Sequence, residues 1–177
     1  MKVFKYLLII LSAVVLLGLL LMQNHTVQNK LFERTAKQLL TAEEIFMEDA
    51  LSVAVCGSRS PLPGPNRAET CLLIQAGTSK FIIDLGRGSG DNLQKWQVDY
   101  SDLEAVILSH LHSDHISDLA EIQFQTWLGG RKAPLSVLGP KGTESTVQGF
   151  AQAFKLDSIY RSEHHGAILP IEAYGYD

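Results

Sequence analysis

Three of the six histidines in the chain and one aspartate lie within six residues, in the segment Ser109-His110-Leu111-His112-Ser113-Asp114-His115. The apolar run 105–108 comes directly before this segment and predicts a buried strand. His110 and His112 alternate along an extended stretch, so both imidazoles can reach one cation. Asp114 and His115 lie past the bend and can reach a second cation. The segment therefore predicts a metal site at the mouth of a strand.

Neutral imidazole and carboxylate are ligands that suit Zn²⁺, with Mn²⁺ or Fe as alternatives. The competing interpretation is a solvated polar loop that is rich in histidine. The combination of two ligand types directly after an apolar strand favours the metal site.

Short apolar runs predict the strands that must position this segment, and helical spacing of apolar residues predicts the helices around them. Gly77-Thr78-Ser79 joins two of the strands as a hairpin. Together these elements predict a mixed sheet that is covered by helices on one side. The expected fold class is therefore α/β, with a mixed sheet of the α+β type. The expected strands are 51–56, 71–74, 80–84, 103–108 and 134–138, the expected helices are 29–49, 91–96, 116–128 and 143–154, and 160–177 is expected to form strands or loop.

Three features near the segment admit two interpretations each. The glycine cluster 86–90 could cradle phosphate, but it lacks the lysine of a P-loop, so a turn that lets backbone approach the metal segment is favoured. Trp127 could line a cleft, although an aromatic residue at helical spacing favours the core. Asp118 is expected to be a solvated helix residue.

The N-terminus reads as a targeting segment. A short basic start precedes Tyr6 to Met22, which carries no charge, so residues 1–25 predict a secretory signal or an uncleaved transmembrane anchor. Residues 26–50 would form a juxtamembrane helical linker, and residues 51–177 the domain. We expect the domain to lie outside the cytoplasm (in the periplasm of a bacterium), or to be secreted if the N-terminus is cleaved. The alternative for the apolar N-terminal segment is a buried core helix.

Charge and cysteine content limit the partners. Without residues 1–25, which hold Lys2 and Lys5 and no acid, the chain carries 13 basic and 19 acidic side chains, a net charge of −6. Nucleic-acid binding is driven by Lys and Arg, so this balance argues against a nucleic-acid partner and favours a small-molecule substrate. Cys56 and Cys71 could form a disulfide or remain two buried thiols. Nothing in the sequence indicates the oligomeric state.

The metal segment resembles the metal-binding motif of the metallo-β-lactamase superfamily. Phe81-Ile82-Ile83-Asp84-Leu85-Gly86 resembles the strand of that family that ends in an aspartate and a glycine turn. Gly57-Ser58-Arg59-Ser60-Pro61-Leu62-Pro63 resembles the loop after the first strand in the ribonuclease Z and arylsulfatase-like branch. The resemblance runs from Leu51 to the C-terminus and is specific for the superfamily rather than for a substrate.

The resemblance implies an αββα sandwich of two halves, of which we expect only the N-terminal half here, as in a chain truncated after its first half-domain. It also implies a di-zinc hydrolase in which His110 and His112 hold one metal, and Asp114 and His115 the other. Asp114 would act on the nucleophile as the catalytic residue, and Asp84 would support the ligands from behind.

The family's later ligands, a further histidine, an aspartate and a last histidine, have no counterpart motif in this sequence. His164 and His165 are the only later histidines, and we expect them in an exposed loop away from metal. The expected function is hydrolysis of an ester-type bond, a phosphodiester or a sulfate ester. The alternatives are an exported amide hydrolase of the β-lactamase type and a catalytically incomplete metal-binding fragment.

Overall fold

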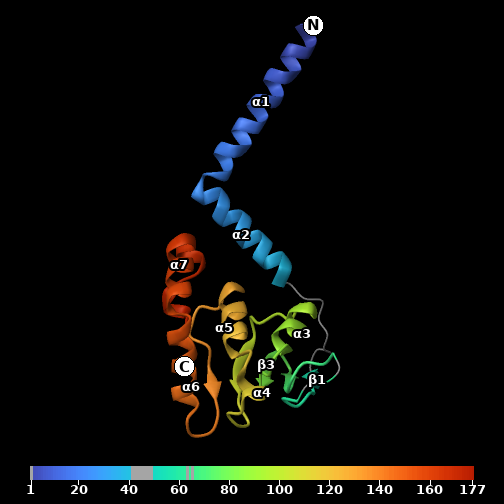
Figure 1. Cartoon of the computed structure of the whole chain (residues 1–177), viewed down its shortest axis with the longest axis vertical. Coiled ribbons are helices and arrows are strands. Elements are labelled where there is room, and N and C mark those ends of the chain that lie inside the picture. The colour runs from blue at the N-terminus through green and yellow to red at the C-terminus, as the bar shows by residue number, and fades with distance from the viewer. Residues whose placement is uncertain (1, 41–49, 63, 65) are drawn as a thin grey trace. The chain divides into compact units, whose positions relative to one another are not determined.

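The computed structural model describes residues 2–40, 50–62, 64 and 66–177 and divides the chain into two compact units, Met1–Lys37 and Gln38–Asp177 (Figure 1). The first unit holds helix α1 (Lys2–Met22) and most of helix α2 (His25–Leu40). The side chain of Asn24 accepts hydrogen bonds from the backbone N–H groups of Thr26 and Val27, which caps the start of α2. Helix α2 therefore begins before residue 29, where the helix expected over 29–49 was predicted to start. The remainder of that expected helix, residues 41–49, lies outside the described residues.

Among the residues that the structure describes, no helix combines the length and the hydropathy that crossing a membrane requires. The transmembrane anchor expected over residues 1–25, and the membrane contact expected through it, therefore find no support.

The second unit is built on a five-stranded sheet with the order β1-β2-β3-β4-β5. The first three strands pair antiparallel and the last three pair parallel, so the sheet is mixed as expected. Gly77 has a φ of 61°, a conformation that glycine adopts without steric cost, and this lets the β2–β3 hairpin turn tightly. The strands are β1 (Leu51–Gly57), β2 (Cys71–Ala76), β3 (Ser79–Ile83), β4 (Leu103–Ile107) and β5 (Val137–Leu138).

The core lies on one face of the sheet. Side chains alternate between the two faces of a strand, and Leu73, Ile82 and Val106 are fully buried on the same face. They pack with Leu93 of α3 and Ile122 of α5 in one hydrophobic cluster. The helices on this face are α3 (Ser89–Lys95), α4 (Ser113–Ile116), α5 (Leu119–Leu128) and α6 (Thr143–Ala153).

The opposite face of the sheet carries an apolar row that does not belong to this cluster. Val55, Leu72 and Ile83 stand opposite one another across β1, β2 and β3, and Ile107 and Leu138 continue the row across β4 and β5. Leu51, Val53, Val55 and Leu138 on this face are each more than half exposed. We call this face the outer row; it consists of Leu51, Val53, Val55, Leu72, Ile74, Phe81, Ile83, Ile107 and Leu138.

The C-terminal region differs from the expectation of strands or loop. It forms helix α7 (Lys155–His165) and two short 3₁₀ turns, η1 (Gly166–Ile168) and η2 (Ile171–Ala173). Arg161 pairs with Asp157 one turn away, which supports the helix itself. The guanidinium of Arg161 also lies over the ring of Phe124 in α5, which contributes to holding this polar helix on the domain. His164 and His165 therefore occupy the last turn of a helix rather than a loop.

The two cysteines form a disulfide, which was one of the two possibilities left open by the sequence. Cys56 lies at an irregularity in the β1–β2 pairing, between Val55 and Gly57, and Gly57 stands opposite Cys71. The bond therefore closes the loop 57–70 at its base.

Trp127 is fully buried and donates its indole N–H to the carbonyl of Pro170, which confirms its assignment to the core.

The same leucine-to-alanine substitution should lower the free energy of unfolding by different amounts on the two faces of the sheet. Leu73→Ala removes a fully buried side chain and should lower the free energy of unfolding by about 2–5 kcal/mol. Leu51→Ala, at a position that is 77% exposed, should change it by less than about 0.5 kcal/mol. Urea unfolding followed by circular dichroism measures both, and equal losses would contradict a core confined to one face.

Candidate metal centre

The predicted metal segment begins at the carboxyl end of β4, beside the carboxyl end of β3. Because these two strands are parallel, the residues that follow them leave the sheet at the same edge. Asp84 follows β3 and Ser109 follows β4, and the backbone N–H of Asp84 donates to the carbonyl of Ile107 at 2.9 Å. The sheet therefore brings Asp84 against the base of the segment although 25 residues separate it from Ser109.

The four predicted ligands meet as two pairs. Nε2 of His110 lies 3.1 Å from Nδ1 of His112, and Nε2 of His115 lies 3.5 Å from Oδ2 of Asp114. The rings of His110 and His115 are adjacent, with centroids 3.9 Å apart, so the two pairs are neighbours. Asp114 and His115 lie in the short helix α4, and His112 precedes it in extended conformation.

The carboxylate of Asp84 is the centre of the hydrogen bonds behind these pairs. Its Oδ1 accepts from the backbone N–H of Ser109 at 2.8 Å, and its Oδ2 accepts from the hydroxyl of Ser109 at 2.7 Å. Oδ2 also lies 2.8 Å from Nδ1 of His115. The Asp84 side chain is only 4% exposed, so these groups replace the water that an ionised carboxylate needs.

This network assigns the tautomers of two histidines. A carboxylate only accepts, so His115 carries its proton on Nδ1 and donates it to Asp84. The hydroxyl of Ser109 already donates to Asp84, so the Nδ1–H of His110 donates to that oxygen at 3.1 Å. Both imidazoles therefore present an unprotonated Nε2 on the side away from Asp84, which is the form that binds a metal ion.

The turn after β3 packs directly against the metal segment. The backbone N–H of Leu85 donates to the carbonyl of His115 at 2.7 Å. A Cβ atom on Gly86 would stand 2.0 Å from the carbonyl oxygen of Asp114, so only glycine allows this approach. The interpretation as a turn that lets backbone reach the metal segment therefore holds for residues 86–88, whereas Ser89 and Gly90 already belong to helix α3.

Asp118 is not the solvated helix residue that we expected. Its Oδ2 accepts from the backbone N–H of Gly90 at 2.9 Å, and its own N–H donates to the carbonyl of Leu85. Burial raises the pKa of its carboxyl group, although backbone hydrogen bonds from Gly90 and Gly88 act in the opposite direction. Asp118 thus ties the glycine turn to the start of α5 and positions the metal segment from its far end.

The donor pairs have the separation that a zinc ion needs, but each supplies only part of a coordination sphere. Two ligands about 2.0–2.1 Å from zinc at a tetrahedral angle lie about 3.3 Å apart, close to the two separations seen here. Within the described residues, no group of three or more His, Cys, Asp or Glu side chains is arranged to hold a metal ion. The donors fit zinc chemistry two at a time, and their assignment as ligands stays a prediction.

Two further outcomes concern the two later histidines, His164 and His165, and a supporting residue, Ser109, that the sequence analysis missed. No described contact joins His164 or His165 to the metal segment, and their rings pack against each other. Ser109 was not predicted as a supporting residue, although it follows β4 as Asp84 follows β3. Two polar residues at the ends of neighbouring parallel strands were the signal that could have paired them.

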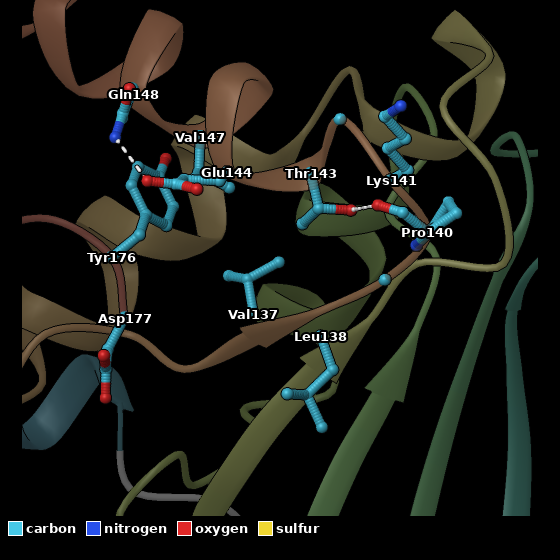
Figure 2. Close-up of a pocket in the computed structure, with 12 residues that line it drawn as sticks. Val137, Leu138, Pro140, Lys141, Thr143, Glu144, Val147, Gln148, Tyr176 and Asp177 are labelled. Atoms are coloured by element: carbon cyan, nitrogen blue, oxygen red, sulfur yellow. Dashed lines mark hydrogen bonds between the residues drawn. The ribbon is translucent and has the colours of Figure 1, made fainter.

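A cavity of about 700 Å³ lies beside β5 and the start of α6 (Figure 2). Glu144 accepts a hydrogen bond from Gln148 on its rim, and Thr143 donates to the carbonyl of Pro140. The carboxylates of Glu144 and Asp177 and the ammonium of Lys141 are its charged groups, and it contains no histidine. The imidazoles therefore mark the metal segment, and not this cavity, as the candidate site.

Comparison with known proteins places the chain in a family. Its sequence matches the profile of the Metallo-beta-lactamase superfamily over residues 64–166. It is 39% identical over 132 residues to a ribonuclease Z of Mycobacterium marinum, a match that covers 71% of this chain and 47% of the relative. It is 37% identical over 132 residues to a ribonuclease Z of Mycobacterium bovis, with the same coverage. The chain thus spans about half the length of the curated relatives it matches.

Solved structures show the same fold over part of their length. The metallo-beta-lactamase fold protein YhfI from Bacillus subtilis is 31% identical, with a TM-score of 0.50 over 58% of this chain and 41% of that one. The short form of human tRNase Z is 20% identical, with a TM-score of 0.51 over 70% of this chain and 42% of that one, and shows the fold alone. The resemblance of residues 81–86 and 109–115, which lie inside the matched range 64–166, is thereby confirmed, whereas residues 57–63 lie outside that range. The chain belongs to the metallo-beta-lactamase superfamily and is ribonuclease Z-like.

Proposed function

We propose that this chain carries the metal-binding part of a hydrolase that cleaves phosphodiester bonds. The observation that carries the proposal is the pair of donor sets, His110 with His112 and Asp114 with His115, backed by the buried carboxylate of Asp84. The metallo-beta-lactamase fold and the relatives named ribonuclease Z support hydrolysis at phosphorus over hydrolysis of a sulfate ester or an amide. They also count against the expectation, drawn from net charge, that nucleic acid is an improbable substrate.

The residues of this chain would hold, orient and move protons. His110 and His112 would hold one divalent cation, and Asp114 and His115 a second. When bound, the cations would supply Lewis-acid activation of water and of the phosphoryl group. The Asp114 side chain, which is 10% exposed, is the carboxylate at the reaction side that could accept a proton from the attacking water. Asp84, on the other side, would keep the imidazoles in the tautomers that bind metal.

The substrate class is tested by zinc content and turnover measured together. The zinc-loaded chain should hydrolyse bis-p-nitrophenyl phosphate faster than p-nitrophenyl sulfate or a cephalosporin, and a chelator should abolish the activity. Preferred cleavage of the cephalosporin would instead support the amide hydrolase. Stoichiometric zinc without turnover of any of the three substrates would support the catalytically incomplete metal-binding fragment.

The role of Asp84 is tested by Asp84→Asn. Asparagine tolerates the φ of 61° found here, so the backbone is preserved, but its amide nitrogen cannot accept a hydrogen bond from His115 or Ser109. Zinc affinity, measured by competition with a chromophoric chelator, should fall about 10–100-fold. Asp102→Asn is the matched control, because Asp102 is 53% exposed and pairs with Lys80 on another part of the sheet. Equal affinities of the two variants would remove Asp84 from the site.

The choice of histidines is tested by a second matched pair of variants. His112→Ala removes one of the two nitrogens that face each other at 3.1 Å and should lower the zinc bound per chain. His164→Ala changes a histidine in the last turn of α7 and should leave the zinc content unchanged. Elemental analysis of the purified variants measures both, and loss of zinc in the second variant would show that α7 contributes a ligand.

A further inference from the structure

The disulfide between Cys56 and Cys71 lies in the core and not on the surface of the loop that it closes. The two cysteines are 1% and 0% exposed and belong to the same hydrophobic cluster as Leu73 and Leu93. A reductant in solution therefore cannot reach the sulfur atoms of the folded chain. The bond has to form before this part of the core closes, so the redox state in which the chain folds is the state that it keeps.

The loop that the disulfide closes is paired along its base. A Cβ atom on Gly57 would stand 1.6 Å from the carbonyl oxygen of Glu69, so only glycine fits at this point. The backbone N–H of Arg59 donates to the carbonyl of Ala68 at 2.9 Å. We call this paired stretch the loop base; it consists of residues 57–59 and 68–70.

The loop base holds the turn that follows β3. The backbone N–H of Gly86 donates to the carbonyl of Thr70 at 3.0 Å, and the N–H of Glu69 donates to the carbonyl of Arg87 at 2.9 Å. The N–H of Arg87 donates in return to the carboxylate of Glu69 at 3.1 Å. Thr70 directly precedes Cys71, so the contact between the loop base and the turn begins beside the disulfide.

The same turn touches two of the predicted ligands. A Cβ atom on Gly86 would stand 2.0 Å from the carbonyl oxygen of Asp114 and 2.5 Å from the Cβ of Glu69, so Gly86 contacts the metal segment and the loop base at once. The backbone N–H of Leu85 donates to the carbonyl of His115 at 2.7 Å. A displacement of the loop base would therefore be passed by direct contact to the backbone that carries Asp114 and His115.

Reduction of the bond would cause such a displacement. Two thiols need more room than two bonded sulfur atoms, and a close-packed core supplies room only when the surrounding backbone moves. The pairing of β1 with β2 resists this movement least at Cys56, because Cys56 is left out of the register between Val55 and Gly57. The loop base is attached at this point and would move with it.

We propose that the Cys56–Cys71 bond positions the metal segment, so that the segment binds zinc with full affinity only in the oxidised chain. The inference rests on the metal binding of the proposed function, and not on hydrolysis. Oxidation passes two electrons and two protons from the thiols to the disulfide of a thiol–disulfide oxidoreductase, which is released as a dithiol. Disulfides form and persist outside the reducing cytoplasm, so metal loading would be confined to the kind of compartment expected from residues 1–25.

Amide hydrogen exchange of the zinc-free chain tests the positioning. The unaltered chain is reduced in denaturant, refolded without oxygen and compared with the oxidised chain. The amide of Leu85, which donates to His115, should exchange severalfold faster after reduction, and its rate should rise by a larger factor than that of the Val106 amide in β4. Leu73→Ala is the control, because it weakens the same core with the bond intact and should raise both rates by the same factor.

Zinc affinity is measured on the double variant Cys56→Ala/Cys71→Ala, which cannot form the bond and offers no thiol to the metal. Competition with a chromophoric chelator should give an affinity about tenfold below that of the oxidised chain, the scale of loss seen when the support behind a metal ligand is removed. Leu73→Ala is again the matched control and should keep the zinc affinity of the unaltered chain.

The outcomes separate this inference from the proposed function. Equal zinc affinities of the double variant and the oxidised chain would overturn the inference, even if the oxidised, zinc-loaded chain hydrolyses bis-p-nitrophenyl phosphate. Equal acceleration of the Leu85 and Val106 amides on reduction, or loss of the whole fold, would also overturn it, because the bond would then support the domain and not the metal segment. If zinc affinity depends on the bond while the loaded chain shows no turnover, the inference stands and the proposed hydrolase fails.

Discussion

The hydrogen bonds of Asp84 are the contact on which the candidate site depends. One buried carboxylate joins the end of β3 to the end of β4 and fixes, directly or through Ser109, the orientation of two imidazoles. Desolvation of a carboxylate is costly, and this cost is offset because three donors surround it. Its backbone φ of 61° is uncommon for a residue with a side chain. The strand register and the glycine turn that follows both hold it in this conformation.

Much of the fold follows from apolar patterning. The alternation in residues 71–74 and 80–84 predicts the hairpin, and the run 103–108 predicts the strand that delivers the metal segment. Helix α7 escaped prediction because its residues are mostly polar, and the contact of Arg161 with Phe124 of α5 depends on tertiary structure. Likewise the disulfide could be suspected from the sequence, but only the register, with Gly57 opposite Cys71, shows that Cys56 can reach its partner.

The candidate site likewise combines features that the sequence predicts with features that arise only in the folded structure. The spacing of His110, His112, Asp114 and His115 predicts two donor pairs, because that information is local. The support that Ser109 and Asp118 give to these pairs is not local: it arises where parallel strands end side by side and where a helix begins. The distribution of charge in the folded chain is the feature that composition predicts least well. The net charge is acidic, yet folding gathers Arg67, Arg87 and Lys95 around one cavity, where the loop after β1 meets helix α3.

The outer row has a practical consequence for the polypeptide in isolation. It places leucine, valine, isoleucine and phenylalanine side chains side by side across all five strands, and four of these residues are more than half exposed to water. Contiguous apolar surface of this kind promotes aggregation. Material produced from this sequence alone should therefore be prone to precipitate as its concentration rises, and mild detergent or a solubilising fusion partner should counteract that tendency.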